Sequence, residues 1–103
     1  MSLVNSKKML IDARKNGYAI GAYNVFNLES IKAIVEAVKE MQQPVIIQAS
    51  ESAIKYAGVE NLVSLVKNEV KNIKTPIALH LDHGKSYDII KACVKAGFTS
   101  VMI

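Results

Sequence analysis

Three titratable side chains stand close together in the sequence, at His80, Asp82 and His83. An adjacent carboxylate and imidazole suit a metal ligand paired with a general acid or base. On an extended strand His80 and Asp82 share one face, because side chains alternate. His83 precedes Gly84, which predicts a tight turn that lets the imidazole swing toward the pocket faced by Asp82.

Taken alone, this motif leaves two interpretations open. His80 could be a core histidine and Asp82 a loop cap, or the three side chains could form a site. The preceding apolar run, bounded by Pro76 and Gly84, is typical of a buried strand. Ligands of α/β folds gather at the carboxyl ends of strands, so a site would be built here.

The composition excludes several classes of protein. The chain has 103 residues, which is one small domain, and its 50% hydrophobic content excludes disorder. The formal net charge is +4, but lysines and arginines are scattered, unlike a nucleic-acid footprint. No apolar run reaches transmembrane length, and residues 1–8 lack an apolar signal core. We expect a cytoplasmic protein that binds neither nucleic acid nor membrane.

Cys93 is the one cysteine of the chain, so no internal disulfide can form. This fits a reducing cytosol. Cys93 falls on an apolar helical stripe, which predicts a buried structural thiol.

Helical and extended patterns alternate along the chain. Ser6, Asn27 and Ser86 are predicted N-caps, and Gly17 and Gly97 are predicted helix ends. Helices are predicted over residues 6–16, 28–42, 51–56, 60–72 and 86–97, and strands over 18–25, 45–50, 75–82 and 100–103.

Strands starting near residues 19, 45, 76 and 100 repeat about every 24 to 31 residues, which is close to one βα unit. Eight such units make a barrel of about 250 residues. An open doubly wound sheet is the rival architecture, and it should carry a glycine-rich phosphate loop after its first strand. No glycine occurs in residues 24–29, which argues against that rival.

Several stretches together resemble the class II, zinc-dependent fructose-bisphosphate aldolase family. They are residues 17–25 (GYAIGAYNV), 27–29 (NLE), 44–50 (PVIIQAS), 79–84 (LHLDHG) and 96–103 (AGFTSVMI). The resemblance implies an α/β fold, the (β/α)8 TIM barrel. Residues 1–103 would be the incomplete N-terminal part of that single domain, with an N-terminal helix and strands 1 to 4.

The resemblance also implies roles for the motif. His83 is expected to be one ligand of a catalytic Zn²⁺, with the remaining ligands beyond Ile103. The zinc would act as a Lewis acid on the ketone carbonyl of dihydroxyacetone phosphate and stabilise the enediolate. Asp82 would be the general acid/base at the hydroxyl of the carbon–carbon bond that forms or breaks.

Three further residues acquire expected roles by the same resemblance. Ser50 and Asn24, at the ends of two strands, are expected to bind substrate, although Ser50 could instead be a plain strand-end cap. His80 is expected to support the site from the barrel interior without binding the metal.

The leading hypothesis is reversible cleavage of fructose 1,6-bisphosphate to dihydroxyacetone phosphate and glyceraldehyde 3-phosphate, in glycolysis and gluconeogenesis. The complete enzyme is expected to be a homo-oligomer. Alternatives are a tagatose-bisphosphate aldolase, a non-catalytic barrel fragment, and an unrelated TIM-barrel metal hydrolase.

Overall fold

The computed structural model describes residues 3–103. Met1 and Ser2, which belong to the predicted domain and to the stretch inspected for a signal sequence, lie outside the described residues. The elements follow in the order α1 (Lys7–Asn16), β1 (Gly21–Asn24), α2 (Leu28–Met41), β2 (Val45–Ser50), α3 (Glu51–Ala57), α4 (Val59–Val70), β3 (Ile77–Asp82), α5 (Tyr87–Ala96) and β4 (Ser100–Val101). Within residues 3–103, no helix is long and apolar enough to span a membrane.

The four strands form one parallel sheet in the order β1-β2-β3-β4. Each strand pairs with its successor, and every connection between paired strands passes through at least one helix. The strand order in the sheet therefore follows the chain without a reversal. A doubly wound sheet has a point at which its strand order reverses, and it binds its ligand there. The arrangement is a run of successive βα units, as a barrel wall requires.

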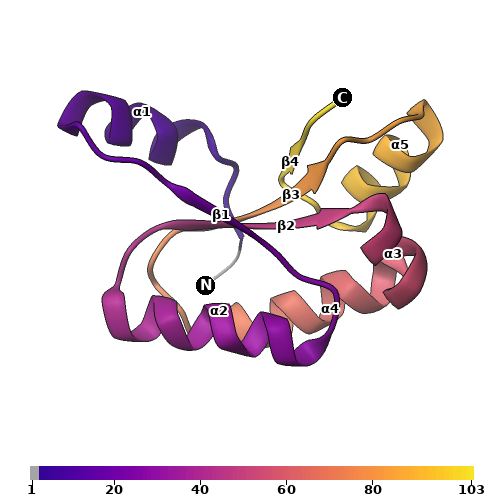
Figure 1. Cartoon of the computed structure of the whole chain (residues 1–103), viewed down its shortest axis with the longest axis horizontal. Helices are drawn as coiled ribbons and strands as arrows, with labels where there is room; N and C mark the ends of the chain where they lie inside the picture. The colour runs from indigo at the N-terminus through magenta and orange to yellow at the C-terminus, as the bar shows by residue number, and fades with distance from the viewer. Residues whose placement is uncertain (1–2) are drawn as a thin grey trace.

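The apolar core lies on one face of this sheet. Alternation points Ile47, Leu79 and Leu81 to that face, where each is 0% exposed. The same core includes apolar side chains of α2, α4 and α5. Figure 1 shows α2 and α4 side by side along the sheet, and Lys32 Nζ lies 3.2 Å from Glu69 Oε1 between them.

Helix α1 lies near the amino ends of the strands. The Val4 N–H just before it donates to the Ile77 carbonyl at 2.9 Å, where β3 begins. In Figure 1, α1 lies at the opposite side from α3 and α5, toward which the strands run. The other end of the sheet is therefore left for the carboxyl-terminal loops.

The first and last strands are shorter than predicted. Gly21 pairs with Val45, the first residue of β2. Residues 18–20 therefore extend past the end of β2 and have no residue of that strand to pair with. Strand β4 ends at Val101, but the Met102 N–H still donates to the Leu81 carbonyl at 2.9 Å.

The helix caps follow the sequence, with one exception. Asn27 forms a capping box with Ser30, and the Ser86 hydroxyl accepts from the Ile89 N–H at 3.3 Å. Ser6 occupies the N-cap position of α1, as predicted, but its side chain makes no cap hydrogen bond. Asn5 Oδ1 accepts from the Lys7 N–H instead, at 3.0 Å.

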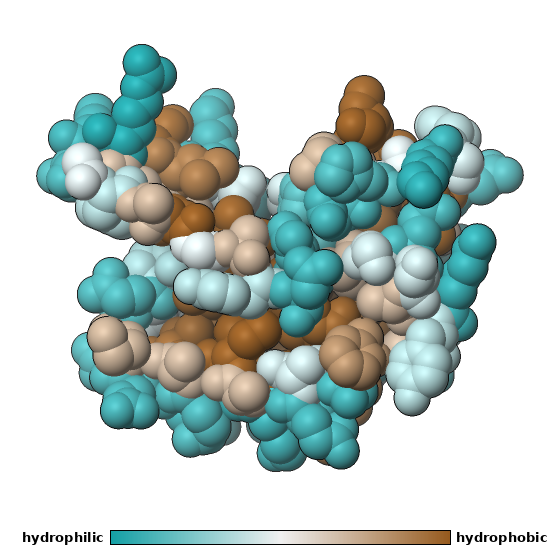
Figure 2. All heavy atoms as spheres, viewed as in Figure 1, coloured by the Kyte–Doolittle hydropathy of each residue, from teal (hydrophilic) through white to brown (hydrophobic). Residues whose placement is uncertain are grey.

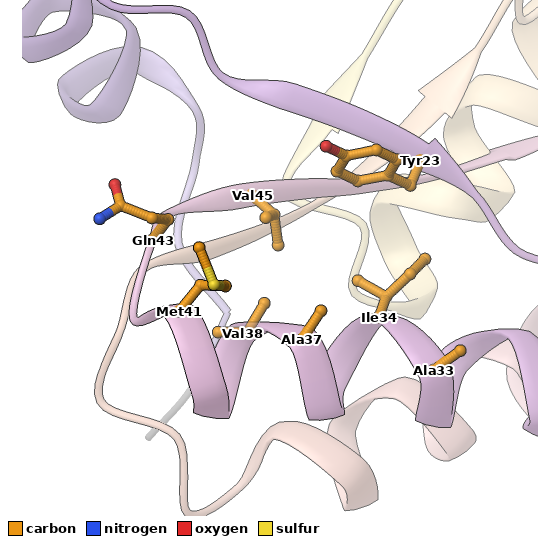
Figure 3. Close-up of a pocket in the computed structure, with 8 residues that line it drawn as sticks. All are labelled: Tyr23, Ala33, Ile34, Ala37, Val38, Met41, Gln43 and Val45. Carbon is orange, nitrogen blue, oxygen red and sulfur yellow. The ribbon is translucent and has the colours of Figure 1, made fainter.

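An apolar groove runs between the edge strand β1 and α2. It has a volume of about 500 Å³ and is lined by Tyr23, Ala33, Ile34, Ala37, Val38, Met41, Gln43 and Val45. Figure 2 shows apolar side chains gathered in a band above the polar outer side of α2, and Figure 3 shows Tyr23 lying over the groove. The groove is on the core face of β1, away from the polar residues described next.

Candidate functional site

The face of the sheet opposite the core carries a polar row. The register aligns Asn24 with Gln48, Gln48 with His80, and His80 with Ser100. Residues that are aligned across neighbouring strands point to the same face of a sheet, so these four side chains share one face. Two residues further along β2 and β3, Ser50 aligns with Asp82 on the same face. Four of the five residues expected to form the site, Asn24, Ser50, His80 and Asp82, thus share this face.

The first pair in the row is Asn24 and Gln48. The Gln48 amide donates to Asn24 Oδ1 at 2.6 Å. Because this bond occupies the Asn24 oxygen, the Asn24 NH₂ group remains as a donor for a ligand. Asn24 is exposed on the edge strand, so a ligand can reach it.

The second pair is His80 and Ser100. His80 Nδ1 and Ser100 Oγ lie 2.7 Å apart. Burial lowers the pKa of His80 from 6.5, while the Asp82 carboxylate opposes that shift and His83 adds to it. The lowered pKa favours the neutral imidazole of His80, whose Nδ1 is held by the Ser100 hydroxyl.

Asp82 and His83 meet at the carboxyl end of β3. His83 Nδ1 lies 2.9 Å from Asp82 Oδ1, and the two side chains are 68% and 20% exposed, respectively. The contact is an ion pair when the imidazole is protonated. Because Nδ1 faces the carboxylate, Nε2 is the ring nitrogen left for a metal.

The turn is made by His83 itself. His83 has φ 57°, a left-handed conformation, whereas Gly84 does not have positive φ. The prediction that Gly84 makes the turn is therefore wrong in detail. Gly84 is required for packing: an added Cβ would lie 2.7 Å from Leu81 Cδ2 and 2.8 Å from Ile90 Cγ1.

Ser50 is both a cap and a neighbour of Asp82. Its hydroxyl oxygen accepts from the Ala53 N–H at 3.3 Å and so caps α3, as the simpler interpretation predicted. The hydroxyl proton remains available to donate to a ligand. Ser50 and Asn24 also line an open hollow of about 510 Å³ at the carboxyl ends of β1 and β2.

Among the described residues, His83 is the side chain that was expected to bind a metal. Within residues 3–103, no three His, Cys, Asp or Glu side chains come together as a metal-binding group. The oriented His83 ring suits one zinc–nitrogen bond, and the family resemblance assigns the other ligands beyond Ile103. The residues present thus fit a zinc ion as contributors of one ligand.

Three residues near the site were not singled out from the sequence: Gln48, Ser100 and Glu51. Gln48 and Ser100 lie on the same strand face as Ser50 and His80, so the period of two could have indicated them. Glu51 Oε2 accepts from the Lys85 N–H at 2.6 Å, a contact between the first turn of α3 and the segment after β3 that no periodicity signals.

Comparisons with known proteins identify the family. The family description "Fructose-bisphosphate aldolase class-II" matches residues 4–103. The chain belongs to the class II fructose-bisphosphate aldolase family. This confirms the resemblance that the strand-end motifs suggested.

Curated relatives and solved structures agree with this family. The chain is 50% identical to a fructose-bisphosphate aldolase of Staphylococcus aureus and 48% identical to one of Geobacillus stearothermophilus. In both cases the match covers 100% of this chain and 37% of the relative. The YdjI aldolase of Escherichia coli K12 superposes with a TM-score of 0.90 at 28% identity, over 97% of this chain and 39% of that one. A putative fructose-1,6-biphosphate aldolase from Coccidioides immitis gives 0.85 at 37% identity, over 96% and 35%.

The chain thus spans only 35% to 39% of the length of these relatives. The matches confirm the predicted α/β class and the TIM barrel, of which residues 3–103 provide five helices and four successive strands. The polar row lies on the face opposite the helix-packed core, as the inner face of a barrel wall does.

Proposed function

We propose that the complete protein is a zinc-dependent aldolase that reversibly cleaves fructose 1,6-bisphosphate to dihydroxyacetone phosphate and glyceraldehyde 3-phosphate. The single observation that carries the proposal is the Asp82–His83 pair at the carboxyl end of β3, with 2.9 Å between Oδ1 and Nδ1. The family match supports the reaction class.

The residues of this chain take distinct parts in the proposed reaction. A bound zinc would supply Lewis acidity at the ketone carbonyl of the substrate. His83 would hold the metal through Nε2, and Asp82 would exchange the proton of the hydroxyl formed or consumed at the reacting carbon–carbon bond. A carboxylate within hydrogen-bond reach of that oxygen is suited to the step.

The polar row would bind the substrate beside these two groups. The NH₂ of Asn24, turned outward by Gln48, and the hydroxyl proton of Ser50 are donors for substrate oxygens. His80 would support the site as a neutral imidazole beside Asp82, held in place by the Ser100 hydroxyl. In this proposal the hydrogen-bond donors and the acid/base group all lie at the carboxyl ends of neighbouring strands.

The proposed setting is glycolysis and gluconeogenesis in the cytoplasm, with a homo-oligomeric complete enzyme. The lone buried Cys93 fits a reducing compartment.

A coupled assay of the complete protein tests the reaction. Fructose 1,6-bisphosphate is expected to be cleaved with release of both triose phosphates, and tagatose 1,6-bisphosphate serves as the epimeric comparison. Faster cleavage of tagatose 1,6-bisphosphate would identify that epimer as the substrate. No cleavage of either sugar bisphosphate would refute the proposed function.

A further inference from the structure

The segment from His83 to Ser86 joins β3 to α5 and carries the candidate metal ligand; it is called the β3–α5 loop below. The ladder between β2 and β3 ends at the pair Ser50 and Asp82. Beyond that pair, β2 continues directly into α3 while β3 enters the loop. No strand pairing holds the loop beside α3, so other contacts must fix it.

Two hydrogen bonds hold the loop backbone from opposite sides. On the β4 side, the Gly84 N–H donates to the Met102 carbonyl at 2.7 Å. On the β2 side, the Lys85 N–H donates to Glu51 Oε2 at 2.6 Å. The bond to Glu51 spans 34 residues of sequence and joins the residue after Ser50 to the loop that carries His83.

The conformation between these anchors is one that the chain would not adopt freely. His83 has φ 57°, a left-handed backbone conformation that is strained for a residue with a Cβ. Such a conformation persists when its surroundings fix it. A hydrogen bond to a carboxylate is about twice as strong as one between neutral groups, so Glu51 is the stronger of the two anchors.

We propose that Glu51 is a positioning residue, which acts through the Lys85 N–H to hold the β3–α5 loop so that His83 presents its free ring nitrogen to zinc. This inference rests on the proposed function for the identity of the metal. A simpler role exists for comparison: Glu51 is an acidic residue in the first turn of α3, where a negative charge is favourable.

Glu60 provides the matched control for that simpler role. It lies in the first turn of α4, so its charge has the same relation to a helix N-terminus, and it is exposed. Glu51→Ala removes both the helix charge and the loop anchor, whereas Glu60→Ala removes only a helix charge.

The test measures zinc affinity in the complete protein by competition with a chelator, together with thermal unfolding of the metal-free form. Glu51→Ala is expected to weaken zinc binding about 10-fold, the lower end of the range for groups that orient metal ligands. Glu51→Gln keeps an acceptor oxygen at the same reach and is expected to restore most of that affinity. Glu60→Ala should leave zinc affinity unchanged.

Glu51→Asp covers the case in which the alanine variant fails to fold. It keeps the charge but is one methylene shorter, so it should weaken zinc binding as alanine does. Equal zinc affinity in wild type, Glu51→Ala and Glu51→Asp would overturn the proposal, and so would equal losses in Glu51→Ala and Glu60→Ala. A wild-type protein that binds zinc but cleaves no sugar bisphosphate would refute the proposed function and leave the Glu51 comparison intact.

Discussion

At the scale of single residues, the site depends on two neighbours in sequence whose side chains meet in space. Alternation predicts that Asp82 and His83 point to opposite faces, and the left-handed backbone of His83 cancels that alternation. Gly84 indicated a turn in the sequence, but the turn falls one residue earlier. The residue types alone did not show this, because the close contacts of Gly84 with Leu81 of β3 and Ile90 of α5 depend on how α5 folds back onto β3.

Asp82→Asn is the sharpest substitution at the proposed acid/base. Asparagine keeps an acceptor oxygen for the His83 Nδ1–H but cannot exchange a proton. We expect turnover by the complete protein to fall by about 10²–10⁴-fold, the usual contribution of general acid–base catalysis, with zinc still bound. Steady-state kinetics and metal analysis measure both quantities; wild-type turnover with zinc in place would exclude the role.

His83→Ala is expected to remove both metal and activity, because a site with two remaining ligands binds zinc poorly. His80→Ala is the control in the same strand, since its Nδ1 is engaged with Ser100 and it is not an expected ligand. The control should retain zinc. Elemental analysis that finds one tightly held zinc in the His83 variant would contradict the assignment.

At the scale of elements, the helices and the inner strands were predictable because caps and periodicity are local. The N-caps at Asn27 and Ser86 and the bounds of β2 follow from neighbouring residues. The short strands do not, because a strand extends only as far as its partner. The contact of Ser6 with Ser100, 3.5 Å between the hydroxyl oxygens, likewise joins distant segments.

Thr99 shows how a side chain can complete the pairing of β3 with β4. Its hydroxyl accepts from the Leu79 N–H at 2.9 Å, and Leu79 is fully buried. Thr99→Val would leave that N–H unpaired, so we expect a loss of about 1–3 kcal/mol of unfolding free energy in the complete protein. Thr99→Ser keeps the hydroxyl and should lose less. Denaturant unfolding that finds both variants equal would contradict this account.

At the scale of the whole molecule, the sheet has two free edges, at β1 and β4. A closed barrel abolishes such edges. The apolar groove beside β1 is open, with Tyr23 51% and Met41 65% exposed. The sequence indicated the repeat and the barrel, but the exposed groove follows only from the positions of α2, β1 and β2 relative to one another.

The 103-residue chain prepared alone is therefore expected to be inactive and to associate, become molten or aggregate, since exposed apolar surface of this kind favours association. Sedimentation, zinc content and aldol cleavage measure the three properties, with the complete protein as the control. A stable monomer that binds one zinc tightly and cleaves the sugar bisphosphate would show that the site is complete within these residues.

Reversible metal removal tests the central claim, that this chain contributes Asp82 and His83 to a zinc-dependent aldolase. The complete protein is assayed for cleavage of fructose 1,6-bisphosphate before EDTA treatment, after it, and after zinc is restored. We expect activity to be lost and then recovered, with no covalent adduct trapped by borohydride in the presence of substrate. Activity that persists without metal, together with a trapped adduct, would indicate a lysine Schiff base and contradict the account.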